Sequence, residues 1–385
     1  MTTKLNVLQV IPKLGYGGAE TGCYDIAHFL SDNDCGSFIA TSGGGLLKFI
    51  KRDKVKLFRL PVHSKNPILM ILNTLVLSFY IIIYRINIVH ARSRAPAWSC
   101  YFACLLTSRV FVTTFHGTYN FKSSFKKFYN SIMLRAKLTI AGSNFIFGHI
   151  NENYNEYLSK EKKLRVIFRG INIDYYNPKN ISVLKQEKLK QEWGLTSNKF
   201  TIILPGRLTY WKGQEKFIES LNILIEDYNV NNFQTIILGS DQGRKVYSKK
   251  LVNLVQRYSL NKKVKFISHC KEMPLAYSLA DVVVSASIEP EAFGRVSVEA
   301  QSMGKPIIAS NIGGSKETII NKKTGFLYKH DDPRELAKIL NTVIQLSPDE
   351  LKSIGNEGRK NITKKFDVET MCQSNLKEYK KLIKN

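Results

Sequence analysis

The chain is short of acidic residues, and the shortage is uneven. It holds 31 Asp and Glu against 57 Lys and Arg in 385 residues, so its formal net charge is +26. Between Lys54 and Asn151 there is no acid at all, while thirteen basic residues occur. Such a surface attracts anions, and nucleic acid, an anionic membrane face or a phosphorylated substrate would each fit. A lysine-rich surface that is simply solvated is the fourth interpretation.

Cysteine motifs and a leader are also missing. The six cysteines form no Cys-x-x-Cys pair, and no histidine cluster accompanies them, which argues against structural zinc and is typical of a reduced compartment. The first residues run directly into an apolar segment, LNVLQVI, and lack a signal peptide's long apolar core and cleavage site. We therefore expect a cytoplasmic protein.

Neither common nucleotide fingerprint is present. GYGGAE follows LNVLQVIP, but it is not Gly-x-Gly-x-x-Gly, and no lysine follows as in a P-loop. Gly17 and Gly18 would still let backbone amides at a helix start approach a phosphate closely. A tight structural turn is the alternative.

What the chain does have is a regular alternation of short apolar runs with helix-length segments. This pattern predicts an α/β protein with two parallel sheets, each covered by helices on both faces. The polar segment 177–191 separates the two sets. We expect two Rossmann-like, doubly wound domains, residues 1–180 and 181–365, facing each other across a cleft. The runs are LNVLQVI, GSFIAT, VKLFRL, INIVHA, RVFVTTF, LTIAG and LRVIF, then FTIILPG, FQTIILG, VKFIS, DVVVSAS and PIIAS.

One uncharged stretch, residues 67–84, raises the question of a membrane span. Its length is at the lower limit for crossing a hydrocarbon core of roughly 30 Å. It lies between two predicted strands, VKLFRL and INIVHA, and a span would put them on opposite sides of a bilayer. A crossover helix is predicted instead, with room for one apolar face at a membrane interface.

Two cations follow the first strand of the second domain. In FTIILPGRLTYWKG the apolar run ends at Pro205, and Arg207 and Lys212 come after it. Ligands of open α/β sheets lie beyond the carboxyl ends of the strands, so both cations are well placed to neutralise a diphosphate. Two solvated loop cations are the alternative.

Two acids follow a later strand in DVVVSASIEPEAFGRVSVEA. The helix is expected to open near Gly294 or Arg295, with Glu291 before it and Glu299 in its second turn. Carboxylates there would accept hydrogen bonds from sugar or ribose hydroxyls, and the amides after Phe293 would face phosphates. Favourable placement of Glu291 at a helix N-terminus is the alternative, but it does not account for Glu299.

One histidine ends a strand of the first domain. His116 follows RVFVTTF and precedes Gly117. Facing the cleft, its ring could donate a hydrogen bond to a sugar hydroxyl or titrate near neutral pH. A hydrogen-bonded structural histidine is the alternative.

Together these segments resemble the family 4 retaining glycosyltransferases of GT-B fold. The resemblance rests on Glu291-x7-Glu299 in EPEAFGRVSVEA, on GRLTYWKG, GGAE and TTFHG, and it covers nearly the whole chain. VHARSRAPAW, residues 89–98, resembles bacterial transferases of lipopolysaccharide or other envelope polysaccharide assembly.

The resemblance implies a donor site for a nucleotide-diphosphate sugar. Gly17 and Gly18 would approach its phosphate and sugar, and His116 would contact the transferred sugar. Arg207 and Lys212 would hold the diphosphate and stabilise it as it leaves.

The acidic motif supplies the remaining donor contacts. Glu291 would bind sugar hydroxyls and Glu299 the ribose, while backbone at Phe293, Gly294 and Arg295 completes the phosphate site. Many members have Glu-Pro-Phe-Gly, whereas this chain has Glu291-Ala292-Phe293-Gly294 after Glu289-Pro290. We align Glu291, because only it keeps the eight-residue spacing to Glu299.

The family transfers sugar with retention, through same-face attack in which the leaving phosphate helps to deprotonate the acceptor. No protein nucleophile is then required, no cofactor besides the donor is expected, and no Asp-x-Asp metal motif is evident. The closing helix, residues 366–385, should return to the first domain. UDP and GDP donors remain equally open.

Acceptor recognition in the family belongs to the first domain, where the acid-free basic stretch lies. We expect a lipid-linked or phosphorylated glycan acceptor at the inner face of the bacterial inner membrane, with Lys122, Lys126, Lys127 and Arg135 facing anionic headgroups. Rival interpretations are a catalytically silent GT-B protein that binds nucleotide sugar or polysaccharide, a sugar-nucleotide epimerase, and a nucleic-acid-binding protein. No module that reads RNA or DNA is recognisable, so no nucleic-acid partner is expected.

Overall fold

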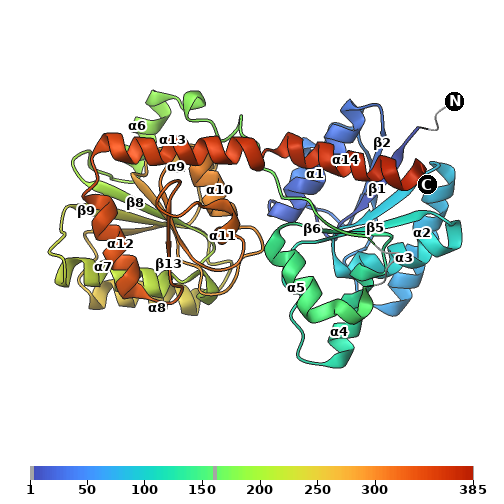
Figure 1. The fold of residues 1–385 in the computed structure, drawn as a ribbon, viewed down its shortest axis with the longest axis horizontal. Helices are drawn as coiled ribbons and strands as arrows, with labels where there is room; N and C mark the ends of the chain where they lie inside the picture. The colour runs from blue at the N-terminus through green and yellow to red at the C-terminus, as the bar shows by residue number, and fades with distance from the viewer. Residues whose placement is uncertain (1–3, 159–162, 385) are drawn as a thin grey trace. The chain divides into compact units, whose positions relative to one another are not determined.

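The computed structural model describes residues 4–158 and 163–384. Its internal contacts divide the chain into two compact units (Figure 1). Unit 1 is Met1–Gly170 with Val368–Asn385, and unit 2 is Ile171–Asp367.

Unit 1 is built on a seven-stranded parallel sheet in the order β3-β2-β1-β4-β5-β6-β7. Every residue of β4 and β6 is buried, as expected for strands covered on both faces. The strands are β1 Asn6–Val10, β2 Gly36–Thr41, β3 Lys56–Arg59, β4 Ile88–Ala91, β5 Val110–Phe115, β6 Leu138–Ala141 and β7 Lys163–Val166. The helices are α1 Gly18–Asp32, α2 Pro67–Ile83, α3 Arg94–Thr107, α4 Ser124–Ser131, α5 Asn144–Tyr154 and α14 Val368–Lys384.

Unit 2 has a six-stranded parallel sheet in the order β10-β9-β8-β11-β12-β13. Its strands are β8 Phe200–Pro205, β9 Phe233–Leu238, β10 Val264–Ile267, β11 Val282–Ser285, β12 Ile307–Ser310 and β13 Phe326–Tyr328. Its helices are α6 Val183–Glu192, α7 Gln214–Glu226, α8 Lys245–Arg257, α9 Met273–Ser278, α10 Arg295–Ser302, α11 Ser315–Thr318, α12 Pro333–Ile344 and α13 Pro348–Lys365.

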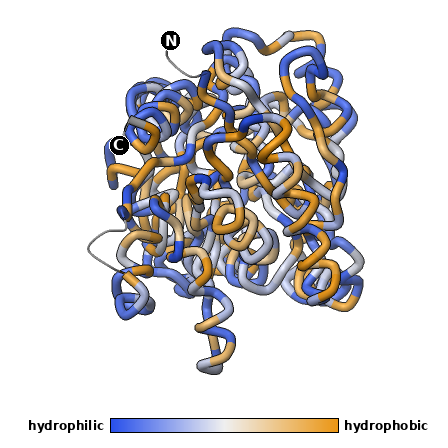
Figure 2. The backbone as a smooth tube through the Cα atoms, turned by 90° about the vertical axis from the view of Figure 1, so that its right-hand side faces the viewer, coloured by the Kyte–Doolittle hydropathy of each residue, from blue (hydrophilic) through white to orange (hydrophobic). Residues whose placement is uncertain are grey.

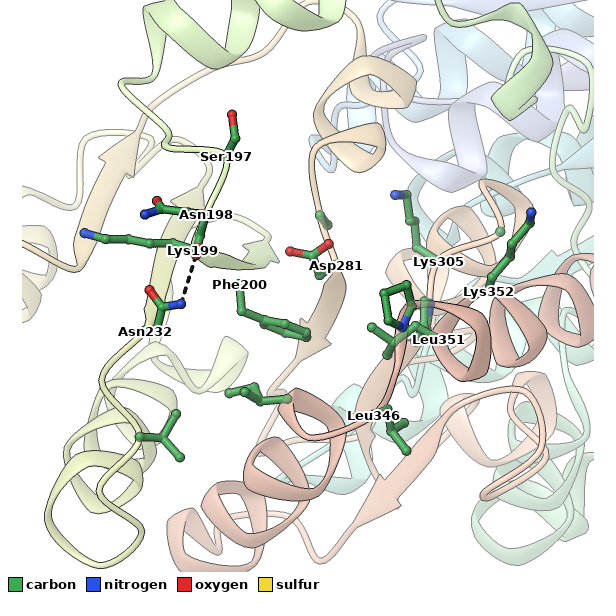
Figure 3. Close-up of a pocket in the computed structure, with 16 residues that line it drawn as sticks. Ser197, Asn198, Lys199, Phe200, Asn232, Asp281, Lys305, Leu346, Leu351 and Lys352 are labelled. Atoms are coloured by element: carbon green, nitrogen blue, oxygen red, sulfur yellow. Dashed lines mark hydrogen bonds between the residues drawn. The ribbon is translucent and has the colours of Figure 1, made fainter.

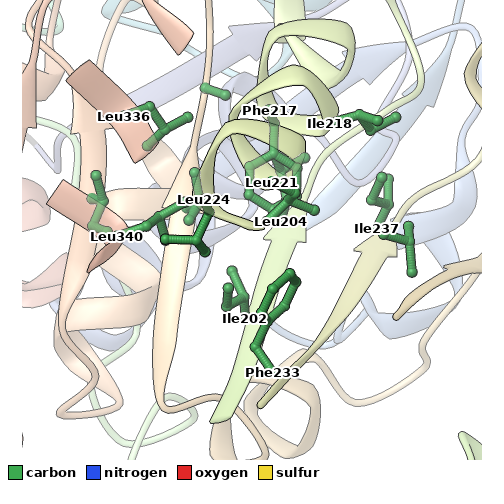
Figure 4. Close-up of a cluster of buried hydrophobic side chains, with 14 of the residues drawn as sticks. Ile202, Leu204, Phe217, Ile218, Leu221, Leu224, Phe233, Ile237, Leu336 and Leu340 are labelled. Carbon is green, nitrogen blue, oxygen red and sulfur yellow. The ribbon is translucent and has the colours of Figure 1, made fainter. Parts of the chain in front are cut away.

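The core of unit 2 shows why the apolar runs take these positions. Ile202 and Leu204 of β8 point the same way because strand side chains alternate, and they meet Phe217 and Leu221 of α7 (Figure 4). Leu340 of α12 closes the cluster. All five are buried, so the sheet and its covering helices share one apolar layer.

Both sheets reverse their strand order at one point. In unit 1 the chain leaves β1 in one direction and returns to β4 on its other side, and in unit 2 the same happens at β8 and β11. Open α/β sheets bind ligands at such switch points, beyond the carboxyl ends of the strands. The prediction of two doubly wound, parallel α/β sheets is therefore confirmed.

The units divide at Gly170/Ile171 and Asp367/Val368, whereas the sequence analysis put the boundaries at 180 and 365. The polar linker begins after the chain has already joined unit 2. The Ile171 amide donates to the Phe366 carbonyl at 2.8 Å, and the Tyr176 carbonyl accepts from Ser302 Oγ at 3.0 Å. These hydrogen bonds carry no signal in composition.

The closing helix packs on unit 1, as predicted. α14 lies against α1, and Met371, Leu376 and Tyr379 enter the cluster that also holds Ile26 and Leu30.

The uncharged stretch forms α2, the crossover helix between β3 and β4 that the sequence predicts. Asn66 caps it and Pro67 is its first residue, a common helix start. Across residues 4–158 and 163–384, no helix is both long and apolar enough to cross a membrane. Figure 2 shows hydrophobic and hydrophilic segments alternating along the tube of the chain.

Candidate active site

The loop after β8 holds the two predicted cations in different environments. Arg207 is exposed, and its carbonyl accepts from the buried side chain of Gln214 at 2.9 Å. The Lys212 side chain is only 12% exposed. Gly213 has φ +69°, and a Cβ there would collide with the carbonyl of Ala286, so the loop can press against the end of β11 only with glycine at this position.

Lys212 meets Glu291 across the switch point of unit 2. Lys212 Nζ lies 2.7 Å from Glu291 Oε1, and the Glu291 side chain is 11% exposed. Ser287 Oγ donates to the same carboxylate oxygen at 2.6 Å. Burial alone would raise the pKa of Glu291, but the charge and hydrogen bond of Lys212, with the Ser287 hydroxyl, outweigh it and lower the pKa. Glu291 is therefore a carboxylate at neutral pH.

Glycines hold the Glu291 loop in place. The amide of Gly314 donates to the Glu291 carbonyl at 2.8 Å, and a Cβ on Gly313 would lie 2.5 Å from that carbonyl oxygen. Gly294 has φ +78° and precedes α10, which opens at Arg295 as the sequence predicts. Buried Phe293 stacks edge-on against Phe366, also in unit 2. The backbone of residues 293–295, which is predicted from the sequence to contact phosphate, thus lies in a tightly packed turn.

Glu299 makes a second, separate pair. Its Oε1 accepts from Arg295 Nε at 2.6 Å, one helical turn away, and its Oε2 accepts from Tyr277 Oη at 2.7 Å. Glu299 is 6% exposed and Tyr277 is fully buried. The Tyr176 hydroxyl is a third hydrogen-bonding neighbour, and because a carboxylate has about four acceptor sites, acceptor capacity remains for a ribose. Nothing in the segment MPLAYS marks Tyr277 as a functional residue, so the sequence does not predict this contact.

Glu289 contrasts with Glu291. It is exposed, and no ion pair found among the described residues involves it. The geometry therefore favours the alignment on Glu291.

In unit 1 the predicted glycines begin α1 beyond the end of β1. Gly17 is the N-cap residue and Gly18 the first helical residue. A Cβ on Gly17 would clash with the carboxylate of Glu20, which folds back over the first turn. The Glu20 carboxylate therefore lies beside the helix start, where a donor's phosphate is expected from the sequence.

His116 follows β5 and is held by an arginine that the sequence analysis did not assign. Arg169 Nη2 lies 2.8 Å from His116 Nδ1 and also donates to the His116 carbonyl at 2.8 Å. Because a guanidinium only donates, Nδ1 must be the acceptor, and the proton sits on Nε2. Burial, then the charge of Arg169, lowers the pKa of His116 well below its ordinary value. The ring is a neutral donor whose Nε2 lacks a partner among the described residues.

Arg92 is a further buried residue of unit 1, and no motif in the sequence predicts its role. It follows β4 at the switch point of unit 1, is 4% exposed, and donates from Nε to Gln9 Oε1 at 2.8 Å. Gln9 in turn donates to the Cys23 carbonyl at 3.0 Å. No ion pair among the described residues includes Arg92, so this buried cation is uncompensated. A polar residue inside the run LNVLQVI was the only signal.

A surface depression in unit 2 lies away from Lys212 and Glu291 (Figure 3). It opens at the amino ends of the strands, where Phe200 begins β8 and Asp281 precedes β11. Lys212 and Glu291 follow the opposite ends of the same strands. Because ligands of such sheets bind beyond the carboxyl ends, we do not assign the depression to the donor.

Comparison with known proteins gives the family. Residues 185–361 match the family described as glycosyl transferases group 1, and residues 16–175 match the one described as Glycosyltransferase Family 4. A crystal structure of a glycosyltransferase from Rickettsia africae ESF-5 is 36% identical, with a TM-score of 0.91 and complete coverage of both chains. The chain belongs to glycosyltransferase family 4. The two sheets of this family 4 protein are those of the GT-B fold.

Other members of the family are more distant. The crystal structure of Anabaena Alr3699/HepE in complex with UDP and glucose is 25% identical, with a TM-score of 0.81 over 98% of this chain and all of that one. Spore coat protein SA of Bacillus subtilis (strain 168) is 27% identical over 59% of this chain and 61% of its own length. Staphylococcus aureus capsular polysaccharide biosynthesis glycosyltransferase CapM is 28% identical over 57% and 58%. The chain thus spans about three fifths of the length of these two curated relatives.

Proposed function

We propose that the protein transfers a sugar from a nucleotide-diphosphate sugar, with retention of anomeric configuration, to a lipid-linked or phosphorylated glycan of the bacterial envelope. The observation that carries the proposal is the Lys212–Glu291 pair at the switch point of unit 2, 2.7 Å apart and almost fully enclosed. Exposed Arg207 lies in the same loop as Lys212. A cation and an acid at this point fit a diphosphate joined to a polyol.

Lys212 and Glu291 would bind different parts of the donor, the cation its diphosphate and the acid its sugar. Lys212 and Arg207 bind the diphosphate, and Glu291, already ionised, accepts hydrogen bonds from sugar hydroxyls. Glu299 accepts from the ribose through its remaining lone pairs. His116 donates from Nε2 to a hydroxyl of the transferred sugar.

In the transfer step, the bond between the sugar C1 and the phosphate oxygen breaks. The acceptor oxygen forms its bond to C1 on the same face, and its proton passes to the leaving phosphate oxygen. Arg207 and Lys212 stabilise the charge that develops on the diphosphate, so the step as proposed needs no metal ion.

Unit 1 would supply the acceptor site. Arg92 and Arg94 follow β4, and no ion pair among the described residues engages either of them. Arg94 Nη1 donates to Asn130 Oδ1 at 2.8 Å, and its guanidinium lies 4.3 Å from the centre of the Tyr119 ring. Two partly satisfied guanidiniums suit a phosphorylated or diphosphate-linked acceptor. Such an acceptor would keep the protein at the cytoplasmic face of the inner membrane.

UDP-glucose is the first donor to try, since the Anabaena relative was crystallised with UDP and glucose. The test is a thermal-shift screen of the full chain against UDP, GDP and their sugars, followed by product analysis with the stabilising donor and membrane lipid extract. We expect a rise in Tm with one nucleotide class and release of that nucleotide on adding acceptor. A shift without any transfer or donor hydrolysis would identify the silent binding protein instead.

A further inference from the structure

The polarity of α2 is reversed relative to an ordinary surface helix. Its polar residues Asn73 and Thr74 are buried and Ser78 is half-buried, and Asn73 Nδ2 donates to the Pro61 carbonyl at 3.2 Å. Every exposed residue of α2 is apolar. The larger ones are each between 51% and 68% exposed and include Ile68, Ile71, Leu72, Leu75, Phe79 and Ile82. A soluble helix normally presents charged or polar side chains here.

The apolar surface continues onto two neighbouring helices. α3 packs along α2 and exposes Leu105 and Leu106 at 59% and 67%. Phe128 of α4 lies 5.7 Å, ring centre to ring centre, from Trp98 of α3, and Phe125 is 78% exposed. Contiguous apolar patches of this kind mark interaction sites. We call the exposed apolar residues of α2, α3 and α4 the apolar face.

Cations flank the apolar face. Lys65 precedes α2, Arg85 follows it and Arg109 follows α3, while Lys122 and Lys126 lie before and within α4. All five are exposed and none is in an ion pair among the described residues. No acid occurs in residues 54–151, which contain the whole apolar face.

The other two cations expected at a membrane are otherwise engaged. Lys127 Nζ lies 2.6 Å from Glu156 Oε1, and the Arg135 guanidinium lies 5.7 Å from the centre of the Phe128 ring. The five flanking cations are therefore the ones that are available to contact lipid headgroups.

We propose that the apolar face lies in the interfacial layer of an anionic bilayer, with α2 parallel to the membrane plane. The 17 residues of α2 give a length of about 25 Å, suited to lying on a membrane. Isoleucine, leucine and phenylalanine enter the acyl boundary, and the flanking cations bind lipid phosphates. A second copy of this chain is a poorer occupant, because a face-to-face dimer would bring its unpaired cations together with no acid to offset them. The inference rests on the proposed action at a membrane and adds the surface that makes the contact.

The test is co-sedimentation of the full chain with vesicles of phosphatidylcholine, with and without phosphatidylglycerol. We expect binding to the anionic vesicles and a loss of roughly tenfold or more in the partition coefficient for Leu75→Gln/Phe79→Gln. The matched control is Leu184→Gln/Val246→Gln, which changes residues 85% and 88% exposed in unit 2 and should bind like the wild type. Lys122→Ala/Lys126→Ala should lose binding to anionic vesicles preferentially.

Insertion depth gives a second readout. Brominated acyl chains should quench the emission that Phe79→Trp adds to that of the native tryptophans, but not the emission that Val246→Trp adds. Nucleotide-induced thermal shifts should be the same in all variants, so failure of the membrane contact is distinguishable from failure of the donor site. Equal recovery of the wild type with and without vesicles would overturn the proposal. So would sedimentation velocity showing a dimer that Leu75→Gln/Phe79→Gln dissociates, without vesicle binding.

Discussion

At the scale of single residues, the candidate site couples two functional side chains, Glu291 and His116, to partners that set their ionisation. Glu291 is kept ionised by Lys212, and His116 is kept neutral by burial and Arg169. Sequence spacing identified Glu291, Lys212 and His116, because all three follow strands. It missed Arg169, which is 53 residues from His116, since no local pattern records such a contact.

Arg207 offers a clean test of diphosphate stabilisation. Its side chain is exposed, so Arg207→Ala should leave Tm within the range of a surface substitution. Turnover should fall on the order of 100-fold or more, the usual effect of deleting one transition-state donor. Steady-state kinetics and thermal unfolding measure the two quantities. Lys323→Ala, which changes a cation 62% exposed elsewhere in unit 2, is the control, and near-normal turnover of Arg207→Ala would contradict the role.

Arg169 should position His116 and set its protonation. In Arg169→Met the ring loses both its fixed tautomer and a nearby positive charge, so the pKa of His116 should rise, while burial still holds it below its ordinary value. Activity should then drop on the acidic side nearer neutral pH than in the wild type. Arg169→Lys should restore part of the profile, while Arg165→Met, an exposed arginine of β7, should not change it. Identical pH profiles for Arg169→Met and the wild type would refute positioning.

The lowered pKa of His116 makes the free energy of unfolding depend on pH. The folded pKa of His116 lies below that of an unfolded histidine, so the unfolded chain binds the proton first. The contribution of neutral His116 to the free energy of unfolding is fully present above about pH 6.5 and is lost as the pH falls toward the folded pKa. For Glu291, whose folded pKa is also lowered, the contribution is present above the ordinary carboxyl pKa and is lost only in acid.

At the scale of elements, the apolar runs in the sequence predict most of the strands, but they do not predict the boundaries between the two units. Runs such as RVFVTTF and FTIILPG became β5 and β8 because buried parallel strands are apolar on both faces. The three-residue strand β13 was missed, since FLY sits among polar residues and is held by pairing to β12. α10 was placed correctly because Gly294 has the left-handed conformation that precedes it.

The closing helix should stabilise unit 1 through one buried hydrogen bond. Tyr379 is fully buried, and its hydroxyl lies 2.5 Å from His90 Nδ1, which is also buried. Tyr379→Phe leaves that nitrogen without its partner and should cost about 1–3 kcal/mol. Urea unfolding measures the loss. Lys377→Ala, on the exposed side of α14, is the control, and equal stabilities of the two variants would rule out this contribution.

At the scale of the whole molecule, the two cores are separate clusters in separate units. Phe217→Ala in unit 2 should cost about 3–5 kcal/mol, and Leu376→Ala in unit 1 about 2–5 kcal/mol. Hydrogen exchange should show that each variant loosens peptides of its own unit, and the double variant should show both local losses of stability, each of the same size as in the single variant. Loss of protection in unit 1 from Phe217→Ala would contradict independent cores.

α14 is synthesised long after the rest of unit 1, the unit on which it packs. The sheet of unit 1 is complete by residue 170, yet the helix that covers α1 is made only after the 197 residues of Ile171–Asp367. At about 5–20 residues per second the ribosome needs roughly 10–40 s for that stretch, during which the apolar side of α1 awaits its cover. A nonsense codon within the last eighteen positions would therefore damage the part of the protein that emerged first, and leave the later-made unit intact.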